Sequence, residues 1–74
     1  MTENQIERQG FDFIKSYTHD KWWTRRFQKG LIQIEFTYKN ETTTLETVSI
    51  TIDEVVGKEF SFDQLKQLDN ILNK

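Results

Sequence analysis

Apolar and polar residues alternate along two stretches in the middle of the chain, Ile32–Tyr38 and Thr47–Ile52. Alternation with a period of two is typical of β-strands that bury one face and leave the other in water. The preceding segment, Trp22–Phe27, is rich in aromatic residues and is predicted to be another strand. These short strands, separated by turn residues, indicate antiparallel pairing of neighbours along the chain.

Short connections are expected between these strands. Gln28–Gly30 is predicted to be a hairpin connection whose glycine adopts a positive φ. Thr18–Lys21 and Lys39–Glu41 are predicted to be turns, and Asn40 in the second turn suits the left-handed conformation. Residues 53–59 are predicted to be a loop that leaves room for a short edge strand at Val55–Val56.

Residues 11–17 fit two interpretations. A helical face would contain residues spaced by four, three and four: Ile6, Gly10, Phe13 and Tyr17. Against a helix, Phe11 and Phe13 alternate with Asp12 directly after a glycine. We therefore predict a strand over Phe11–Tyr17. A short helix is predicted before it, with Thr2 as N-cap, Gln5 completing a capping box and Gly10 as the stop.

The end of the chain carries the signals of an amphipathic helix. Ser61 is a suitable N-cap, Gln64 completes a capping box, and Phe60 and Leu65 occupy the positions of a hydrophobic staple. One apolar stripe then follows with helical spacing: Phe62, Leu65, Leu68, Ile71 and Leu72. Such a stripe is usually core and only sometimes a dimer face.

Together these elements predict one small α+β domain over residues 1–74. The expected fold is an antiparallel four-stranded meander with the C-terminal helix packed on one face and a possible short N-terminal helix. One helix can cover only one face of such a sheet. The other face is predicted to be polar and either solvated or used by a partner: Gln33, Glu35, Thr37, Thr47, Ser49 and Thr51.

Composition narrows the possible functions. The chain has no cysteine, and its polar N-terminal residues lack the apolar segment of a secretory signal, so a cytoplasmic location is expected. No stretch is long and apolar enough to suggest a membrane span. The net charge of −2 disfavours non-specific binding to nucleic acid.

One segment, Lys21–Lys29, holds both tryptophans and four of the ten basic residues, and it contains no acid. Exposed tryptophan beside arginine is frequent where proteins bind each other, and the same pair can hold single-stranded nucleic acid by stacking and phosphate contact. The residues expected to contact a partner are Lys21, Trp22, Arg25, Arg26 and Lys29. If Trp23 and Phe27 pack under the helix, Trp22 and Arg26 lie on the polar face.

Four interpretations follow from this segment. The structural one is a strand whose tryptophan covers the sheet and whose arginine pairs with Glu35. Among functional ones, we expect a non-enzymatic binding or adaptor protein with a protein partner, and the alternative is a single-stranded nucleic-acid binder. Association of two copies through edge strands is a further possibility.

An enzyme is not expected. His19–Asp20 could orient a general base, but no nearby serine, cysteine or second histidine completes a site. The adjacent acids Asp53 and Glu54 are too few for a calcium cage, and the three glycines are isolated rather than arranged in a phosphate-binding loop. Neither a metal nor a cofactor is predicted.

Three segments carry a resemblance that runs along most of the chain: Gln9–Phe11, Leu31–Phe36 and the helix Phe60–Leu68. In this order the chain resembles short uncharacterised α+β proteins of bacteria and their phages. The resemblance implies a small accessory protein that acts by binding, and it assigns no role to any residue.

Overall fold

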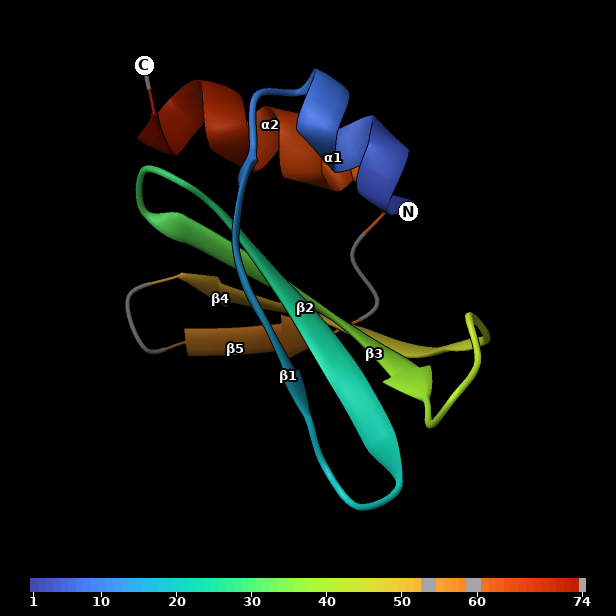
Figure 1. Ribbon diagram of the computed structural model, residues 1–74. Helices are drawn as coiled ribbons and strands as arrows, with labels where there is room; N and C mark the ends of the chain where they lie inside the picture. The colour runs from blue at the N-terminus through green and yellow to red at the C-terminus, as the bar shows by residue number, and fades with distance from the viewer. Residues whose placement is uncertain (53–54, 59–60, 74) are drawn as a thin grey trace.

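The computed structural model describes residues 1–52, 55–58 and 61–73, and it shows an α+β fold (Figure 1). A short N-terminal helix is followed by five strands and a C-terminal helix. The elements are α1 (Glu3–Arg8), β1 (Asp12–Thr18), β2 (Trp22–Lys29), β3 (Ile32–Lys39), β4 (Leu45–Ile52), β5 (Val55–Lys58) and α2 (Phe62–Leu72).

The sheet is an antiparallel meander in the order β1-β2-β3-β4-β5, so each strand pairs with its neighbour in sequence. The predicted fold class, with its meander, C-terminal helix and short N-terminal helix, is confirmed. The fifth strand, Val55–Lys58, lies where the sequence left room for a short edge strand, and it extends the meander by one strand.

The cross-strand register decides which side chains share a face, because residues directly opposite one another in an antiparallel pair point the same way. Phe27 lies opposite Ile34, and Ile34 lies opposite Ile50. These three side chains and their neighbours form the core with residues from both helices: Ile6, Phe11, Phe27, Ile32, Ile34, Phe36, Ile50 and Leu65. Both helices therefore pack on one face of the sheet, where Figure 1 shows them gathered over one end of it.

The N-terminal helix ends before the first strand begins. Thr2 and Gln5 form the expected capping box, and Gly10 follows the helix with a φ of 99°. The strand interpretation of residues 11–17 is confirmed with a shift of one residue, because Phe11 precedes β1 and is buried in the core. A β-bulge between Phe13 and Lys15 lies in this edge strand.

The C-terminal helix begins as predicted, with Ser61 and Gln64 in a capping box. The staple residue Phe60 lies outside the described residues. The inclusion of Ile71 in the buried stripe was wrong, because its side chain is 71% exposed. The other four predicted residues of the stripe are buried or pack against the core, and Asp69, which is 3% exposed, joins them on the face toward the sheet.

Two turns differ in detail from the sequence prediction. Strand β2 continues through Lys29, so the β2–β3 turn is Gly30–Leu31, with Gly30 at a φ of 56° as expected of this glycine. In the β3–β4 connection the left-handed residue is Glu41, with a φ of 58°, and not Asn40. Asn40 instead holds the neighbouring turn, donating from Nδ2 to the Asp20 carbonyl at 3.3 Å.

The two described helices are short. Neither of them is long and apolar enough to cross a membrane.

Candidate functional site

The face of the sheet opposite the helices carries the polar side chains of the central strands. Trp22 lies opposite Lys39, Thr24 opposite Thr37, and Arg26 opposite Glu35. Trp23 lies opposite Tyr38 and Phe27 opposite Ile34, which places Trp23 and Phe27 on the helix side. Trp22 and Arg26 therefore lie on the helix-free face, as the sequence predicted for this arrangement.

Trp22 forms one wall of a groove on the helix-free face. The groove has a volume of about 440 Å³ and is lined by residues of β2, β3 and β4 and of the β1–β2 turn: Lys21, Trp22, Thr37, Lys39, Glu46 and Thr47. We refer to it as the Trp22 groove. Trp22 is 45% exposed. This is a large exposure for a tryptophan, because indole rings are usually buried in a core or an interface.

An aromatic row continues from the Trp22 groove toward the edge of the sheet. The His19 ring lies 5.6 Å from the Trp22 ring and 5.1 Å from the Tyr17 ring, and Lys15 Nζ lies 5.3 Å from the Tyr17 ring. Such separations are those of favourable aromatic and cation–π contacts. His19 therefore packs against two rings while its side chain stays exposed to solvent.

Arg26 is held by acid and aromatic groups of the neighbouring strands. Its Nη2 donates to Glu35 at 3.3 Å, and Tyr17 donates its hydroxyl to the same carboxylate. Burial, reinforced by the hydrogen bond to Glu35, raises the pKa of Tyr17 above its usual value. The Nε of Arg26 is buried and has no hydrogen-bond partner within the described residues. The pairing of an arginine with Glu35, which the structural interpretation expected, is confirmed for Arg26.

Arg25 and Lys29 lie on the helix side of the sheet and not with Trp22. Arg25 Nε donates to Glu3 of α1 at 2.7 Å, and its guanidinium carbon lies 4.5 Å from the centre of the Phe13 ring. Lys29 contacts Asp69 of α2. Of the five predicted contact residues, Lys21 and Trp22 line the Trp22 groove, Arg26 lies on the same face but pairs with Glu35, and Arg25 and Lys29 lie on the helix side.

The separation follows from the alternation of side chains along β2, since residues an odd number apart point to opposite faces. Sequence reasoning also missed two residues of the Trp22 groove, Lys39 and Glu46. Lys39 lies directly opposite Trp22. The β2–β3 register that places Lys39 opposite Trp22 depends on where the turn lies. Only the position of the Gly30–Leu31 turn could therefore have indicated that Lys39 belongs to the groove.

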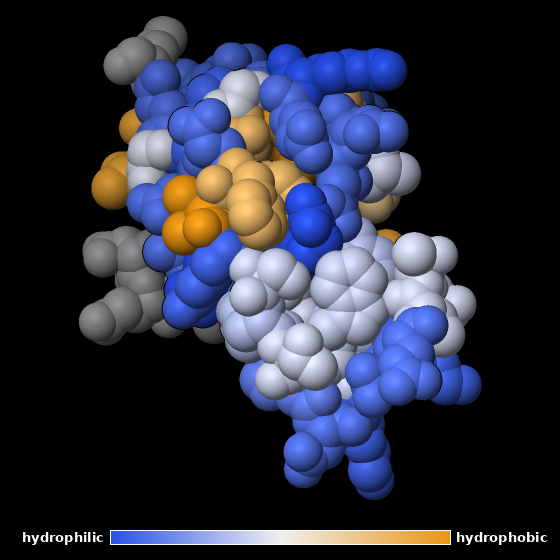
Figure 2. Space-filling view, in the orientation of Figure 1, coloured by the Kyte–Doolittle hydropathy of each residue, from blue (hydrophilic) through white to orange (hydrophobic). Residues whose placement is uncertain are grey.

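Hydropathy also distinguishes the two ends of the molecule. In Figure 2 the strongly apolar atoms (orange) gather in the upper half, below and beside the helices, whereas the opposite end of the sheet is white and blue. The Trp22 groove includes Lys21 of the β1–β2 turn, which lies at that opposite end (Figure 1). The groove therefore lies away from the main core.

Comparisons of the chain with protein-family models, with curated proteins and with solved structures find no match.

Proposed function

We propose that the protein is a small binding or adaptor protein that presents the helix-free face of its sheet to a protein partner. The observation that carries this proposal is Trp22, which is 45% exposed between the Trp22 groove and His19. Tryptophan and arginine dominate the binding energy of many protein interfaces, where a rigid ring fills a pocket and polar groups surround it. Here Trp22 would supply the buried area, and Lys21 and Lys39 would supply polar contacts at the rim.

The charges of the helix-free face favour a protein over a nucleic acid. Glu35 compensates the charge of Arg26 at 3.3 Å, and Arg25 and Lys29 lie on the helix side. Three of the basic groups in the Lys21–Lys29 segment are thus unavailable to a phosphate backbone on this face. Affinity for nucleic acid depends on such cations, because neutralising phosphates releases counterions.

Single-stranded nucleic acid is the second proposal, and the aromatic row supports it. Tyr17, His19 and Trp22 offer successive ring contacts, and Lys15 lies beside them. Bases stack on exposed rings with little sequence preference, and nearby lysines can contact phosphates. A single-stranded nucleic acid would lie along this row of Tyr17, His19 and Trp22.

Selection of displayed random peptides on the immobilised protein tests the first proposal. We expect peptides that bind the wild type and the control variant Ile71→Ala but not Trp22→Ala. Ile71 is the matched control, because it is an exposed large apolar residue on α2, remote from the Trp22 groove. Peptides that bind all three proteins equally would count against the Trp22 groove as the binding surface.

Titration of a single-stranded oligonucleotide at low and near-physiological salt tests the second proposal. Tryptophan fluorescence should change saturably at low salt, and the affinity should fall steeply as salt rises if phosphates are bound. Lys21→Ala should weaken that binding, with Lys66→Ala on α2 as the control. No change at low salt, where phosphate attraction is strongest, would remove the nucleic-acid proposal.

We further propose that the protein acts by binding rather than by catalysis and that it functions in the cytoplasm, as a small accessory protein of bacterial or phage type. The absence of cysteine supports a reducing compartment. An edge-to-edge homo-oligomer is compatible with this role, because the edge strand β1 leaves backbone groups unpaired on its outer side.

A further inference from the structure

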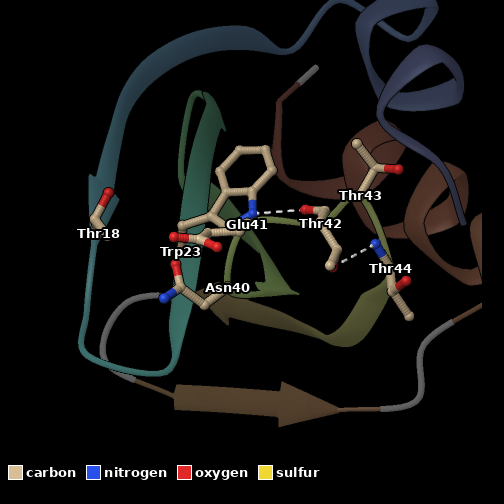
Figure 3. Close-up of a pocket in the computed structure, with 7 residues that line it drawn as sticks. All are labelled: Thr18, Trp23, Asn40, Glu41, Thr42, Thr43 and Thr44. Carbon is tan, nitrogen blue, oxygen red and sulfur yellow. Dashed lines mark hydrogen bonds between the residues drawn. The ribbon is translucent and has the colours of Figure 1, made fainter.

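A second hollow lies on the helix side of the sheet, at the end away from the helices, and is built around Trp23 (Figure 3). It has a volume of about 730 Å³ and is open to solvent. Its lining comes from β1, β2 and the β3–β4 connection: Thr18, Trp23, Asn40, Glu41, Thr42, Thr43 and Thr44. We refer to it as the Trp23 pocket, and none of its residues lines the Trp22 groove.

The Trp23 ring is fixed in place by two contacts. Its indole Nε1 donates to the Thr42 carbonyl at 2.8 Å, as the dashed line in Figure 3 shows. Its ring stacks on Tyr38 with a centroid distance of 4.6 Å and an angle of 24° between the planes. One face of the indole is thus covered, and the ring is held rigid without any ligand.

The other face of the indole is left open by a small neighbour. Thr18 lies opposite Trp23 on β1, and Tyr38 lies opposite it on β3, so the two residues flank the ring on the same face of the sheet. Threonine is too short to cover an indole, and β1 is the edge of the sheet. Figure 3 shows Thr18 apart from the ring on one side and Thr42–Thr44 on the other, with Asn40 and Glu41 drawn below the ring between them.

The charge of the Trp23 pocket selects a class of ligand. Among the described residues that line it, Glu41 alone is ionisable, so the lining carries one negative charge and no positive one. Within the described part of the chain, the side chains of Thr18, Glu41 and Thr43 make no hydrogen bond to other residues. A rigid indole face beside a carboxylate is the chemistry that recognises an organic cation, with tryptophan the best of the aromatic residues for this purpose.

The backbone at Glu41 has an unusual conformation. Its φ of 58° lies in the left-handed region, which few residues other than glycine and asparagine adopt. The hydroxyl of Thr42 holds the connection, because it donates to the Lys39 carbonyl at 2.8 Å and accepts from the Thr44 amide at 3.2 Å. The connection that carries Glu41 is thus held by hydrogen bonds among its own residues and Lys39.

We propose that the Trp23 pocket binds an organic ammonium group, which Trp23 contacts through its open face and Glu41 through its carboxylate. The group could belong to a free small molecule or to a methylated lysine of a partner protein, and the recognition chemistry is the same. This site is independent of the Trp22 groove, since the two lie on opposite faces of the sheet.

Titration followed by ¹H–¹⁵N NMR tests the proposal, because the two indole N–H groups give separate reporters. Choline should shift the Trp23 indole resonance saturably, and the Trp22 resonance on the opposite face should stay in place. The neutral isostere 3,3-dimethylbutan-1-ol should bind at least about tenfold more weakly, which corresponds to ~1.4 kcal/mol. The peptide glycyl-trimethyllysyl-glycine, compared with choline, distinguishes a partner's side chain from a free small molecule.

Two surface variants complete the test. Glu41→Gln keeps the shape of the side chain and removes its charge, so it should weaken choline binding by about tenfold. Thr18→Leu should block the open indole face and abolish the shift, while circular dichroism verifies that both variants are folded. Three results would each overturn the proposal. Choline and its neutral isostere could bind equally well, the pocket could bind maltose and not choline, or the Trp23 indole resonance could show no saturable shift.

Discussion

Lys29 links the end of α1 to α2 through hydrogen bonds. From the end of β2 its ammonium donates to Asp69 of α2 at 2.6 Å and to the carbonyl of Gln9, just after α1, at 2.7 Å. Gln9 also donates its amide to Asp69 at 2.8 Å, and Asn73 donates to the other carboxylate oxygen at 3.1 Å. The carboxylate of Asp69, which is only 3% exposed, is thereby hydrogen-bonded on both oxygens.

Replacement of Lys29 by methionine keeps much of the side-chain volume and removes the ion pair. We expect the free energy of unfolding to fall by about 2 kcal/mol, since the variant leaves a buried carboxylate without its cation and Lys29 is partly exposed. Urea denaturation measures this change. The matched variant Lys66→Met removes the exposed pair with Asp63, at 3.4 Å, and should cost less than about 0.5 kcal/mol. Equal losses of unfolding free energy in the two variants would show that the Lys29–Asp69 pair stabilises the fold no more than an exposed pair does.

The carboxylate of Asp69 also makes the stability of the fold depend on pH. Burial alone would raise the pKa of Asp69, but the hydrogen bonds from Gln9, Lys29 and Asn73 outweigh burial and lower this pKa. A depressed pKa in the folded state gives stability that is present above the pKa of the unfolded chain and is lost as the pH falls through the folded value.

The wild type should therefore lose stability as the pH falls below about 4, while the variant Asp69→Asn should lose less over the same range. Urea midpoints measured at several pH values provide the comparison, with Asp63→Asn as an exposed control. A parallel decline in the wild type and Asp69→Asn would contradict the assignment of this pH dependence to Asp69.

At the scale of elements, both helices are defined by local signals. In each capping box the side chain of the N-cap and that of the residue three positions on satisfy backbone N–H groups that the first turn leaves unpaired. The Ser61 hydroxyl accepts from the amide of Gln64 at 3.1 Å, and the Gln64 side chain accepts from the amide of Ser61 at 2.9 Å. The start of α2 is therefore marked by two residues that are close together in the sequence.

Ser61→Ala removes one of these two bonds. The expected loss is about 1 kcal/mol in the free energy of unfolding, measured by thermal or urea denaturation. Ser16→Ala, at an exposed position of β1, is the control and should change stability by less than about 0.5 kcal/mol. A loss at Ser61 no greater than at Ser16 would mean that water replaces the cap at little cost.

The contrast between local and non-local signals explains what the sequence could predict. Alternation and capping are local, so the strands and the two helices were predicted correctly, whereas the alternation alone left open which of the two tryptophans faces the core. Arg25 and Arg26 are adjacent in sequence and were assigned to one site, whereas a strand places neighbours on opposite faces. Asp69 interrupts an apolar stripe, and only the arrival of Lys29 from another element makes its burial favourable.

At the scale of the whole molecule, the two ends of the sheet differ in role. The end beneath the helices holds the core, including Phe27 with a fully buried ring. The opposite end carries the Trp22 groove on one face and the Trp23 pocket on the other. The protein thus separates the residues that stabilise the fold from those proposed to bind.

This separation predicts opposite outcomes for two aromatic substitutions. Phe27→Ala should cost about 3–5 kcal/mol in the free energy of unfolding, because it leaves a cavity in the core. Trp22→Ala should cost less than about 1 kcal/mol, because Trp22 is 45% exposed and lies outside the core. Chemical denaturation measures both variants. A large loss at Trp22 would indicate that its packing against His19 stabilises the fold and would weaken the case for a binding role.

The meander order also has a consequence for the rate at which the folded state forms and decays. Every strand pairs with its sequence neighbour, so the sheet can grow by closing short loops, which is fast. The contact between Gln9 and Asp69 spans 60 residues and has to wait until both helices have docked. An interaction that forms after the transition state affects unfolding more than folding. We therefore expect the polar network around Lys29 to slow unfolding more than it speeds folding.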